Sequence, residues 1–285
     1  MKAFVNNCII FCLLLLGIYV VVYWLYYRIT LPENKNVVYI WGDSQMSQDL
    51  DLKYLNTGSH YQYRSAAQHG AGIYDFLVFT GSVPDYSNVL IQISYPVLLR
   101  RKEVDRNISA LDFNSLNELS INHYSPQEIY TIIRKNILPT RLFVDCNYLF
   151  PNADTMTYNE PMSIFTYIYS KKPVYFDDKK NLYLYGIKNL IRKRCKITGI
   201  IFPYYPTLKK IHANAPYSRE LAAFDKQISD CFTRNATIDI RSDSNLFYDL
   251  THFNLRGAEY LSKAIIPYLD FKNESLLIKV QEPDL

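Results

Sequence analysis

Short apolar runs rich in β-branched and aromatic residues constrain the fold of this chain more than any other feature. Val37–Trp41 (VVYIW) ends at Gly42, and residues 88–94 (NVLIQIS) have the same character. Strands of a parallel sheet are covered on both faces, so they read as continuous apolar runs rather than alternating ones. The two runs therefore predict buried parallel strands that each lead into a turn.

Further runs of this kind alternate with helical patterns along the chain. Strands are also predicted at residues 142–145, 197–202 and 237–240, and helices at 72–80, 125–136, 181–194, 218–232 and 255–268. Such alternation is typical of an α/β fold whose parallel sheet carries helices on both faces. Residues 37–285 are predicted to be one domain of this class. Residues 100–180, rich in Tyr, Asn and Pro, are predicted to be an insertion in it.

An uncharged apolar run extends from Cys8 to Tyr27, ahead of the predicted domain. About 20 apolar residues span the core of a bilayer as a helix. The run is longer than the core of a typical secretion signal and no small-x-small pattern follows it, although a cleaved signal stays open as the alternative. We expect residues 1–29 to be a single-pass membrane anchor and residues 30–36 a polar stalk. With no second apolar run, the domain is expected on the extracytoplasmic side.

Charge and cysteine content narrow the classes of partner. The formal net charge is +4, and the one basic cluster, between Lys188 and Lys196, is typical of the solvated C-terminal end of a helix. No nucleic-acid partner is expected. The cysteines outside the apolar run have no spacing of a metal site, and no metal or organic cofactor is expected.

The first motif with chemical potential is Gly42-Asp43-Ser44-Gln45, directly after the first predicted strand. Ligands of open parallel sheets collect at the carboxyl ends of the strands. A serine in such a turn exposes its hydroxyl, and its own backbone N–H can face a developing oxyanion. By itself the motif indicates no more than a structural turn, in which Asp43 accepts hydrogen bonds from the backbone.

The second motif is Asp249-x-x-His252, which leads into the last predicted helix. This spacing lets one loop bring the carboxylate to the imidazole, where it would fix the tautomer and stabilise the imidazolium. Asn254 is placed to cap the helix, and Gly257 to allow close packing. The structural alternative makes Asp249 or Thr251 a helix cap and His252 a packed histidine.

Taken together, the two motifs are more specific than either alone. A strand-ending Gly-Asp-Ser followed by Asp-x-x-His-x-Asn-x-x-Gly at the last helix resembles the GDSL/SGNH hydrolase family. The resemblance covers the domain from about Val37 to Tyr268 and is firm only at its two ends. It implies a three-layer α/β/α fold of the flavodoxin-like type. It also implies Ser44 as the nucleophile, His252 as the base and Asp249 as the residue that orients the base.

The oxyanion hole is where the resemblance is weakest. The family supplies the backbone N–H of the nucleophile, here Ser44, and that of a glycine after the second strand, for which Gly70 is the first candidate and Gly72 the second. Its Gly-x-Asn-Asp motif should follow the strand at 88–94, but the chain reads Ser-Tyr-Pro-Val from Ser94. The side-chain Asn donor therefore has no counterpart, although Ser94 and Tyr95 carry hydroxyls there.

The resemblance and the predicted anchor imply a serine esterase or O-acyltransferase. Its expected substrates are short acyl esters, acetyl above all, on a cell-envelope polysaccharide. Three alternatives stay open: a lipase-like esterase, a catalytically inactive domain that binds acylated glycans or a partner, and an auxiliary subunit of a membrane acyltransferase. The sequence does not distinguish hydrolysis from transfer.

Overall fold

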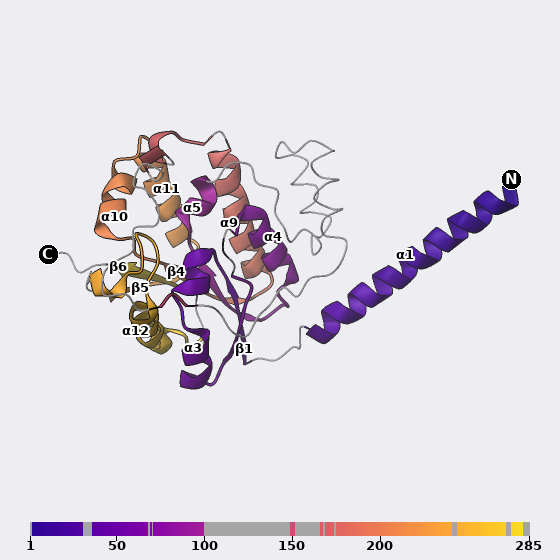
Figure 1. Cartoon of the computed structure of the whole chain (residues 1–285), viewed down its shortest axis with the longest axis horizontal. Coiled ribbons are helices and arrows are strands. Elements are labelled where there is room, and N and C mark those ends of the chain that lie inside the picture. The colour runs from indigo at the N-terminus through magenta and orange to yellow at the C-terminus, as the bar shows by residue number, and fades with distance from the viewer. Residues whose placement is uncertain are drawn as a thin grey trace. The chain divides into compact units, whose positions relative to one another are not determined.

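The computed structural model describes residues 2–30, 36–67, 69, 71–99, 149–151, 166–167, 169–173, 175–240, 244–271 and 275–281. The chain divides into two compact units, Met1–Asn34 and Lys35–Leu285 (Figure 1). The larger unit is an α/β domain, as predicted.

A six-stranded sheet in which every strand is parallel to its neighbours forms the centre of the larger unit. From edge to edge the strands are β2 (Gln62–Ser65), β1 (Val37–Trp41), β3 (Asn88–Gln92), β4 (Lys196–Ile201), β6 (Leu276–Gln281) and β5 (Arg234–Asp239). The order is consistent with a flavodoxin-like arrangement. Because β2 and β3 lie on opposite sides of β1, the strand order reverses there, and such a point opens a crevice at the carboxyl ends of the strands.

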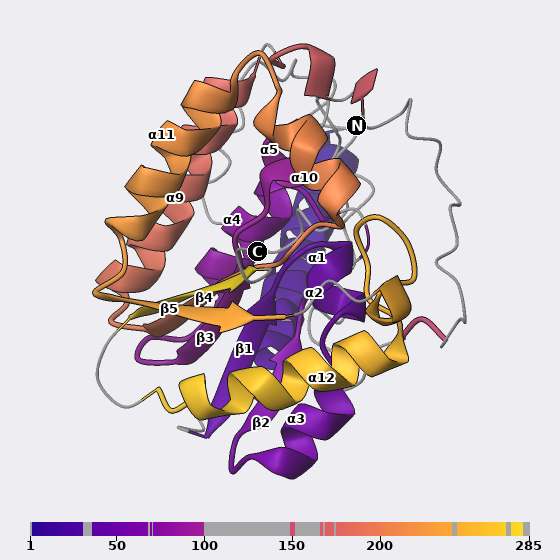
Figure 2. The same cartoon turned by 90° about the vertical axis from the view of Figure 1, so that its left-hand side faces the viewer.

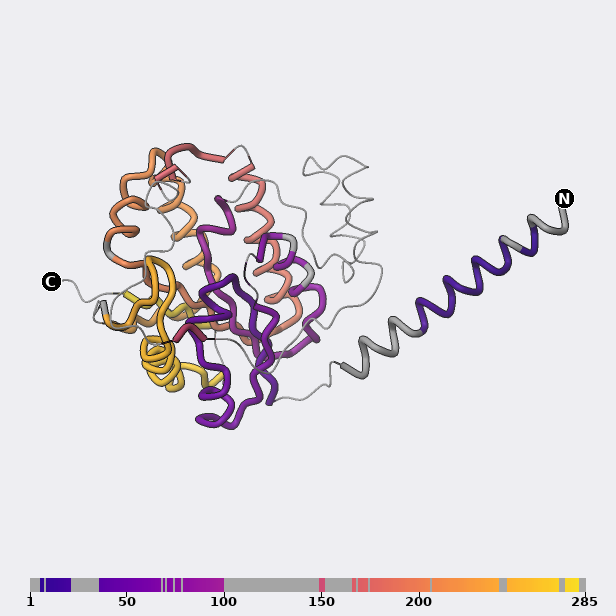
Figure 3. The backbone as a smooth tube through the Cα atoms, viewed as in Figure 1, coloured from indigo at the N-terminus to yellow at the C-terminus, as the bar shows by residue number. Residues whose placement is uncertain are grey.

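Helices cover both faces of the sheet, which gives three layers (Figure 2). One face carries α4 (Ile73–Ser82), α9 (Phe176–Arg192) and α11 (Ser218–Ser229), and the other carries α3 (Leu52–Gly58) and α12 (Leu255–Ile265). The other helices described in this unit are α2 (Ser44–Gln48), α5 (Tyr95–Leu99) and α10 (Pro206–Ala213), with 3₁₀ turns at Ser244–Leu246 and Ile266–Tyr268. Figure 3 follows the backbone through these elements.

The residues of β1 show why its run is apolar throughout. Val38 and Ile40 belong to the buried cluster that also holds side chains of α3 and α12. Trp41 packs against Phe76 of α4, with ring centroids 4.5 Å apart. Both faces of the strand are therefore buried, and a charged side chain at any of these positions would lose its hydration.

Most predicted elements of the described residues are confirmed, with shifted ends. β1 matches its predicted range, and β3, β4 and β5 overlap theirs, as do α4, α9, α11 and α12. The strand predicted at 142–145, the helix predicted at 125–136 and most of the insertion predicted at 100–180 lie outside the described residues.

Two strands, β2 and β6, are missing from the predicted set. β2 is an edge strand in which only Tyr63 and Ser65 are buried, so its sequence (QYRS) carries no continuous apolar run. β6 does carry a continuous apolar run, at residues 276–278, but this strand follows the last predicted helix. It inserts between β4 and β5, which leaves β5 at the edge with most of its side chains exposed.

The smaller unit contains one helix, α1 (Lys2–Thr30). Large apolar side chains between Ile9 and Val21 are exposed on it, for example Phe11 at 61%. Among the described residues, no helix meets the length and hydropathy required of a membrane span, so the predicted span is not confirmed.

Candidate active site

The turn after β1 presents one accessible polar side chain between two buried ones. Asp43 caps α2 by accepting a hydrogen bond from the Gln45 N–H at 3.0 Å. Asp43 and Gln45 are buried, whereas Ser44 between them is half-exposed. Asp43 thus has the structural role expected of it, and Ser44 is the residue of this motif that a substrate can reach.

Gly42 is required by the tightness of this turn. A Cβ atom at this position would lie 2.2 Å from the Cβ of Met46 and 2.6 Å from the side-chain oxygen of Gln92. Neither neighbour can withdraw easily, because Met46 belongs to α2 and Gln92 is fully buried. The glycine lets α2 begin directly above the end of the strand.

The loop between Phe247 and Phe253 carries the second motif and is closed at its base. Phe247 and Phe253 form an isolated antiparallel bridge, and the Tyr248 N–H donates to the His252 carbonyl at 2.8 Å. Immediately afterwards, Asn254 caps α12 by accepting from the Gly257 N–H at 3.1 Å. The capping role predicted for Asn254 is confirmed.

Gly257 has the packing role expected of it. A Cβ atom there would lie 2.3 Å from the carbonyl oxygen of Leu246 and 2.8 Å from the side chain of Phe253. The first turn of α12 therefore packs directly on the backbone before the loop.

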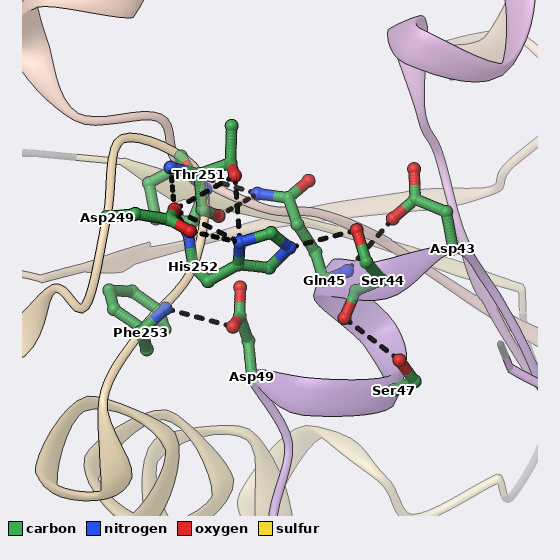
Figure 4. A network of polar contacts seen from close by, with 10 residues as sticks. Asp43, Ser44, Gln45, Ser47, Asp49, Asp249, Thr251, His252 and Phe253 are labelled. Atoms are coloured by element: carbon green, nitrogen blue, oxygen red, sulfur yellow. Dashed lines mark hydrogen bonds and ion pairs between the residues drawn. The ribbon is translucent and has the colours of Figure 1, made fainter. Parts of the chain in front are cut away.

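The two motifs meet in space although 208 positions separate Ser44 from His252 (Figure 4). The Oγ of Ser44 lies 2.9 Å from Nε2 of His252. On the other side of the ring, Nδ1 lies 2.8 Å and 3.0 Å from the two carboxylate oxygens of Asp249. With its proton on Nδ1, the imidazole donates to Asp249 and leaves Nε2 free to accept the Ser44 proton.

Charge and burial act in opposite directions on the two titratable groups of this chain of hydrogen bonds. Burial raises the pKa of Asp249, but hydrogen bonds from His252 and Thr251 outweigh it and hold that pKa below its usual value. Burial lowers the pKa of His252, but the hydrogen bond with Asp249 and the charge of Asp49 outweigh it, so the pKa of His252 is raised. The arrangement favours a charged Asp249 and a His252 that is a stronger base than free imidazole.

Two buried glutamines connect the turn to the loop. Gln92, at the end of β3, accepts from the N–H groups of Asp43 at 2.9 Å and Met46 at 3.3 Å. Its amide nitrogen donates to the side chain of Gln45 at 3.1 Å, and Gln45 donates in turn to the Thr251 carbonyl at 2.8 Å. This relay fixes the distance between Ser44 and His252, and neither glutamine was predicted to belong to the site.

Asp49 is a third unpredicted member. It is buried, and it accepts from the Phe253 N–H at 2.9 Å, which holds the backbone next to His252. Figure 4 shows its other oxygen pointing toward the imidazole. Burial raises the pKa of Asp49 well above its usual value, and the charge of His252 acts against that rise. Neither Asp49 nor Gln92 belongs to a recognisable motif, so only their positions in the fold connect them with the site, whereas Gln45 directly follows Ser44 in the first motif.

The N–H of Ser44 stands out from its neighbours at the start of α2. The N–H groups of Asp43, Gln45 and Met46 all donate to side-chain oxygens. Within the described part of the chain, the Ser44 N–H has no hydrogen-bond acceptor. Among the N–H groups of this turn it is therefore the one that no described atom of the chain accepts from.

The structure gives a different result for each of the other candidate oxyanion donors. Gly70 lies outside the described residues. The N–H of Gly72, the second candidate, donates to the side chain of Asp75 at 2.8 Å, so it is committed to the start of α4. The Ser94 hydroxyl donates to Asp43, and the Tyr95 hydroxyl donates to Asp225. Both hydroxyls are thus bonded to carboxylates.

Comparison with known proteins adds no family to this geometry. No protein-family model matches the chain, and no curated protein matches its sequence significantly. Within the described residues, no group of three or more His, Cys, Asp or Glu side chains is arranged to hold a metal ion. The function has to be argued from the residues of the site.

Proposed function

We propose that the larger unit is a serine esterase or O-acyltransferase of the SGNH type. The observation that carries the proposal is the unbroken chain of hydrogen bonds from Ser44 through His252 to Asp249. This order of nucleophile, base and carboxylate suits acyl transfer, and it lies at the carboxyl ends of parallel strands, where ligands bind. Neither step of the proposed reaction requires a metal or an organic cofactor.

The first step is attack on an ester carbonyl. His252 takes the proton of Ser44 on Nε2 as the Oγ of Ser44 bonds to the carbonyl carbon. Asp249 stabilises the imidazolium that results. The oxyanion accepts a hydrogen bond from the N–H of Ser44, with Gly70 as the proposed second donor. His252 then gives its proton to the leaving alcohol oxygen, and an acyl-serine remains.

The second step resolves the acyl-serine. Water or an acceptor hydroxyl loses its proton to His252 and attacks the acyl carbon, and Ser44 recovers its proton from the imidazole. Which of the two nucleophiles enters decides between hydrolysis and transfer. The proposed substrate is a short acyl ester, acetyl above all, on a cell-envelope glycan.

The proposal includes membrane attachment with the larger unit on the extracytoplasmic side. It rests on the apolar run from Cys8 to Tyr27 and on the exposed apolar side chains of α1. Flotation of the full chain with phosphatidylcholine vesicles, compared with a Leu13→Lys, Leu16→Lys variant, tests it. Equal flotation of both proteins contradicts attachment through this run.

A fluorophosphonate probe tests the catalytic proposal on the full chain in detergent. The wild type is expected to be labelled at Ser44 and to turn over a short-chain aryl ester. Ser44→Ala and His252→Ala should lose both activities. Ser47→Ala is the matched control, since Ser47 lies one turn further along α2 and its hydroxyl donates to the Ser44 carbonyl at 3.0 Å. This variant should keep both activities.

A second candidate function is binding of acylated glycans, or of a partner, without turnover. The commitment of the Ser94 and Tyr95 hydroxyls to carboxylates favours it, because no side-chain oxyanion donor replaces the absent Asn among these residues. A folded wild type that neither labels nor turns over would support this candidate instead.

A further inference from the structure

Two aromatic rings from distant parts of the chain meet beside His252. Phe150 and Tyr248 are stacked face to face, with ring centroids 4.1 Å apart and planes 7° apart. The centroid of Phe150 is also 5.3 Å from that of the His252 ring. Tyr248 directly precedes Asp249 in the closed loop, whereas Phe150 comes from the region predicted to be an insertion.

Both rings are half-buried, as are Ser44, Asp249 and Thr251 beside the imidazole. Asp49, on another side of the ring, is buried, and Thr251 and Asp249 occupy the Nδ1 side. A ligand that approaches His252 can therefore meet Phe150 and Tyr248. Because the Tyr248 backbone is tied to the His252 carbonyl, this part of the surface is fixed relative to the imidazole.

The reaction itself determines which half of an ester lies near His252. Nε2 gives its proton to the leaving alcohol oxygen and later takes one from the entering hydroxyl. Each of these two oxygens must therefore come within hydrogen-bond reach of the imidazole. Side chains that flank the imidazole consequently face the alcohol half of the ester rather than the acyl half.

Stacked aromatic rings offer a flat apolar surface at little cost in conformational freedom. They discriminate in favour of a ligand that has a flat apolar face of its own, and a flexible chain gains less because it must be ordered on binding. A pyranose ring and an aryl ring share this shape.

We propose that Phe150 and Tyr248 form a subsite for the alcohol half of the substrate, and that this half is a cyclic alcohol with a flat apolar face, such as a pyranose. The inference rests on the proposed acyl-transfer function and names its substrate class. Phe150 and Tyr248 are binding residues in it, and neither takes part in proton transfer.

The test compares three acetate esters that differ only in the alcohol: a methyl glucopyranoside monoacetate, phenyl acetate and n-hexyl acetate. Each is assayed with the full chain in detergent, as wild type and as Phe150→Leu and Tyr248→Leu, which keep apolar volume without a ring. We expect kcat/KM for the cyclic esters to fall about fivefold in both variants, the scale of one aromatic contact. Turnover of hexyl acetate and fluorophosphonate labelling should stay unchanged.

Two controls separate the subsite from packing. Tyr248→Phe keeps the stack and should keep the preference for cyclic esters. Tyr260→Leu removes an exposed tyrosine on α12, 49% exposed, and should change nothing. A fall for the glucopyranoside ester alone identifies a sugar, and a fall for phenyl acetate alone identifies an aryl alcohol.

Equal losses on all three esters, or none, would overturn the subsite while labelling at Ser44 leaves the proposed function standing. A folded wild type that is not labelled at Ser44 would overturn the proposed function and the subsite with it.

Discussion

The turns that follow β1 and β3 lie at the carboxyl ends of neighbouring strands, yet their hydroxyl groups have different kinds of hydrogen-bond partner. After β1, the Ser44 hydroxyl meets the imidazole of His252, and its N–H has no acceptor within the described residues. After β3, the hydroxyls of Ser94 and Tyr95 are both bonded to carboxylates. In the proposed mechanism a hydroxyl at the carboxyl end of a parallel strand is therefore not enough for chemistry, because its bonding partner decides whether it can react.

The two turns are also connected, since Gln92 of β3 accepts from the backbone of the turn after β1. The end of β3 and the turn after it thus support the turn after β1, through Gln92 and through the hydrogen bond from Ser94 to Asp43. The following substitutions test this division between a reactive turn and a supporting one.

The largest effect is expected from Asp249→Asn. An amide at this position can offer its NH₂ to Nδ1, which favours the imidazole tautomer that cannot accept the Ser44 proton. We expect kcat for a short-chain aryl ester to fall by about 10⁴-fold with little change in fold. Asp239→Asn, on the exposed side of β5, is the control and should keep wild-type kcat. A loss below tenfold for Asp249→Asn would contradict the triad.

Gln92→Leu should have the next largest effect, on stability as well as rate. It leaves the N–H groups of Asp43 and Met46 without their acceptor, and the Gln45 side chain without its donor. Each of these three buried groups costs about 1–3 kcal/mol when it is left unsatisfied, so the free energy of unfolding should fall by about 3 kcal/mol or more in urea titrations. Gln227→Leu, at an exposed position of α11, should leave it nearly unchanged.

Ser94→Ala tests the comparison directly. If Ser94 only supports Asp43, kcat should fall less than about tenfold, whereas loss of an oxyanion donor costs about 10²–10³ in kcat. Tyr95→Phe, which removes the hydroxyl bonded to Asp225, is the companion variant and should behave in the same way. A fall of a hundredfold or more for either variant would show that the second turn is also reactive.

The smallest effect is a change of pH dependence in Asp49→Asn. In the proposed mechanism turnover needs neutral His252, so the rate should decline as the pH falls through the His252 pKa. The hydrogen bond with Asp249 raises that pKa, and so do the negative charges of Asp49, Asp249 and Asp43. Removing the Asp49 charge should lower the pKa of His252, and the acid limb of the kcat/KM profile should therefore move to lower pH.

The isosteric amide can still accept from the Phe253 N–H, so the backbone contact of the Asp49→Asn variant is kept. Asp51→Asn, at the cap of α3, is the control and should leave the limb in place. A limb that moves to higher pH in Asp49→Asn, or does not move, would contradict a charge effect of Asp49 on His252.

The local sequence was sufficient wherever one element carries its own signal. β1 is buried on both faces, and its apolar run predicted its full extent. Asp43 and Asn254 cap helices that begin within their own motifs, so their roles could be predicted too. The same holds for the approach of Asp249 to His252, because the two residues are only three positions apart in one loop.

Only the tertiary structure decided what depends on contacts between distant segments. The position of β6 between β4 and β5 leaves no trace in either neighbouring strand's sequence. Gln92, Asp49 and Phe150 enter the site through partners 46 or more positions away, and no periodicity or spacing records such a pairing. The sequence by itself predicted a parallel α/β sheet, with a serine near the start of the domain and a histidine near its end. Folding determined that they meet at 2.9 Å, because hydrogen bonds and burial act between neighbours in space, whatever their separation along the chain.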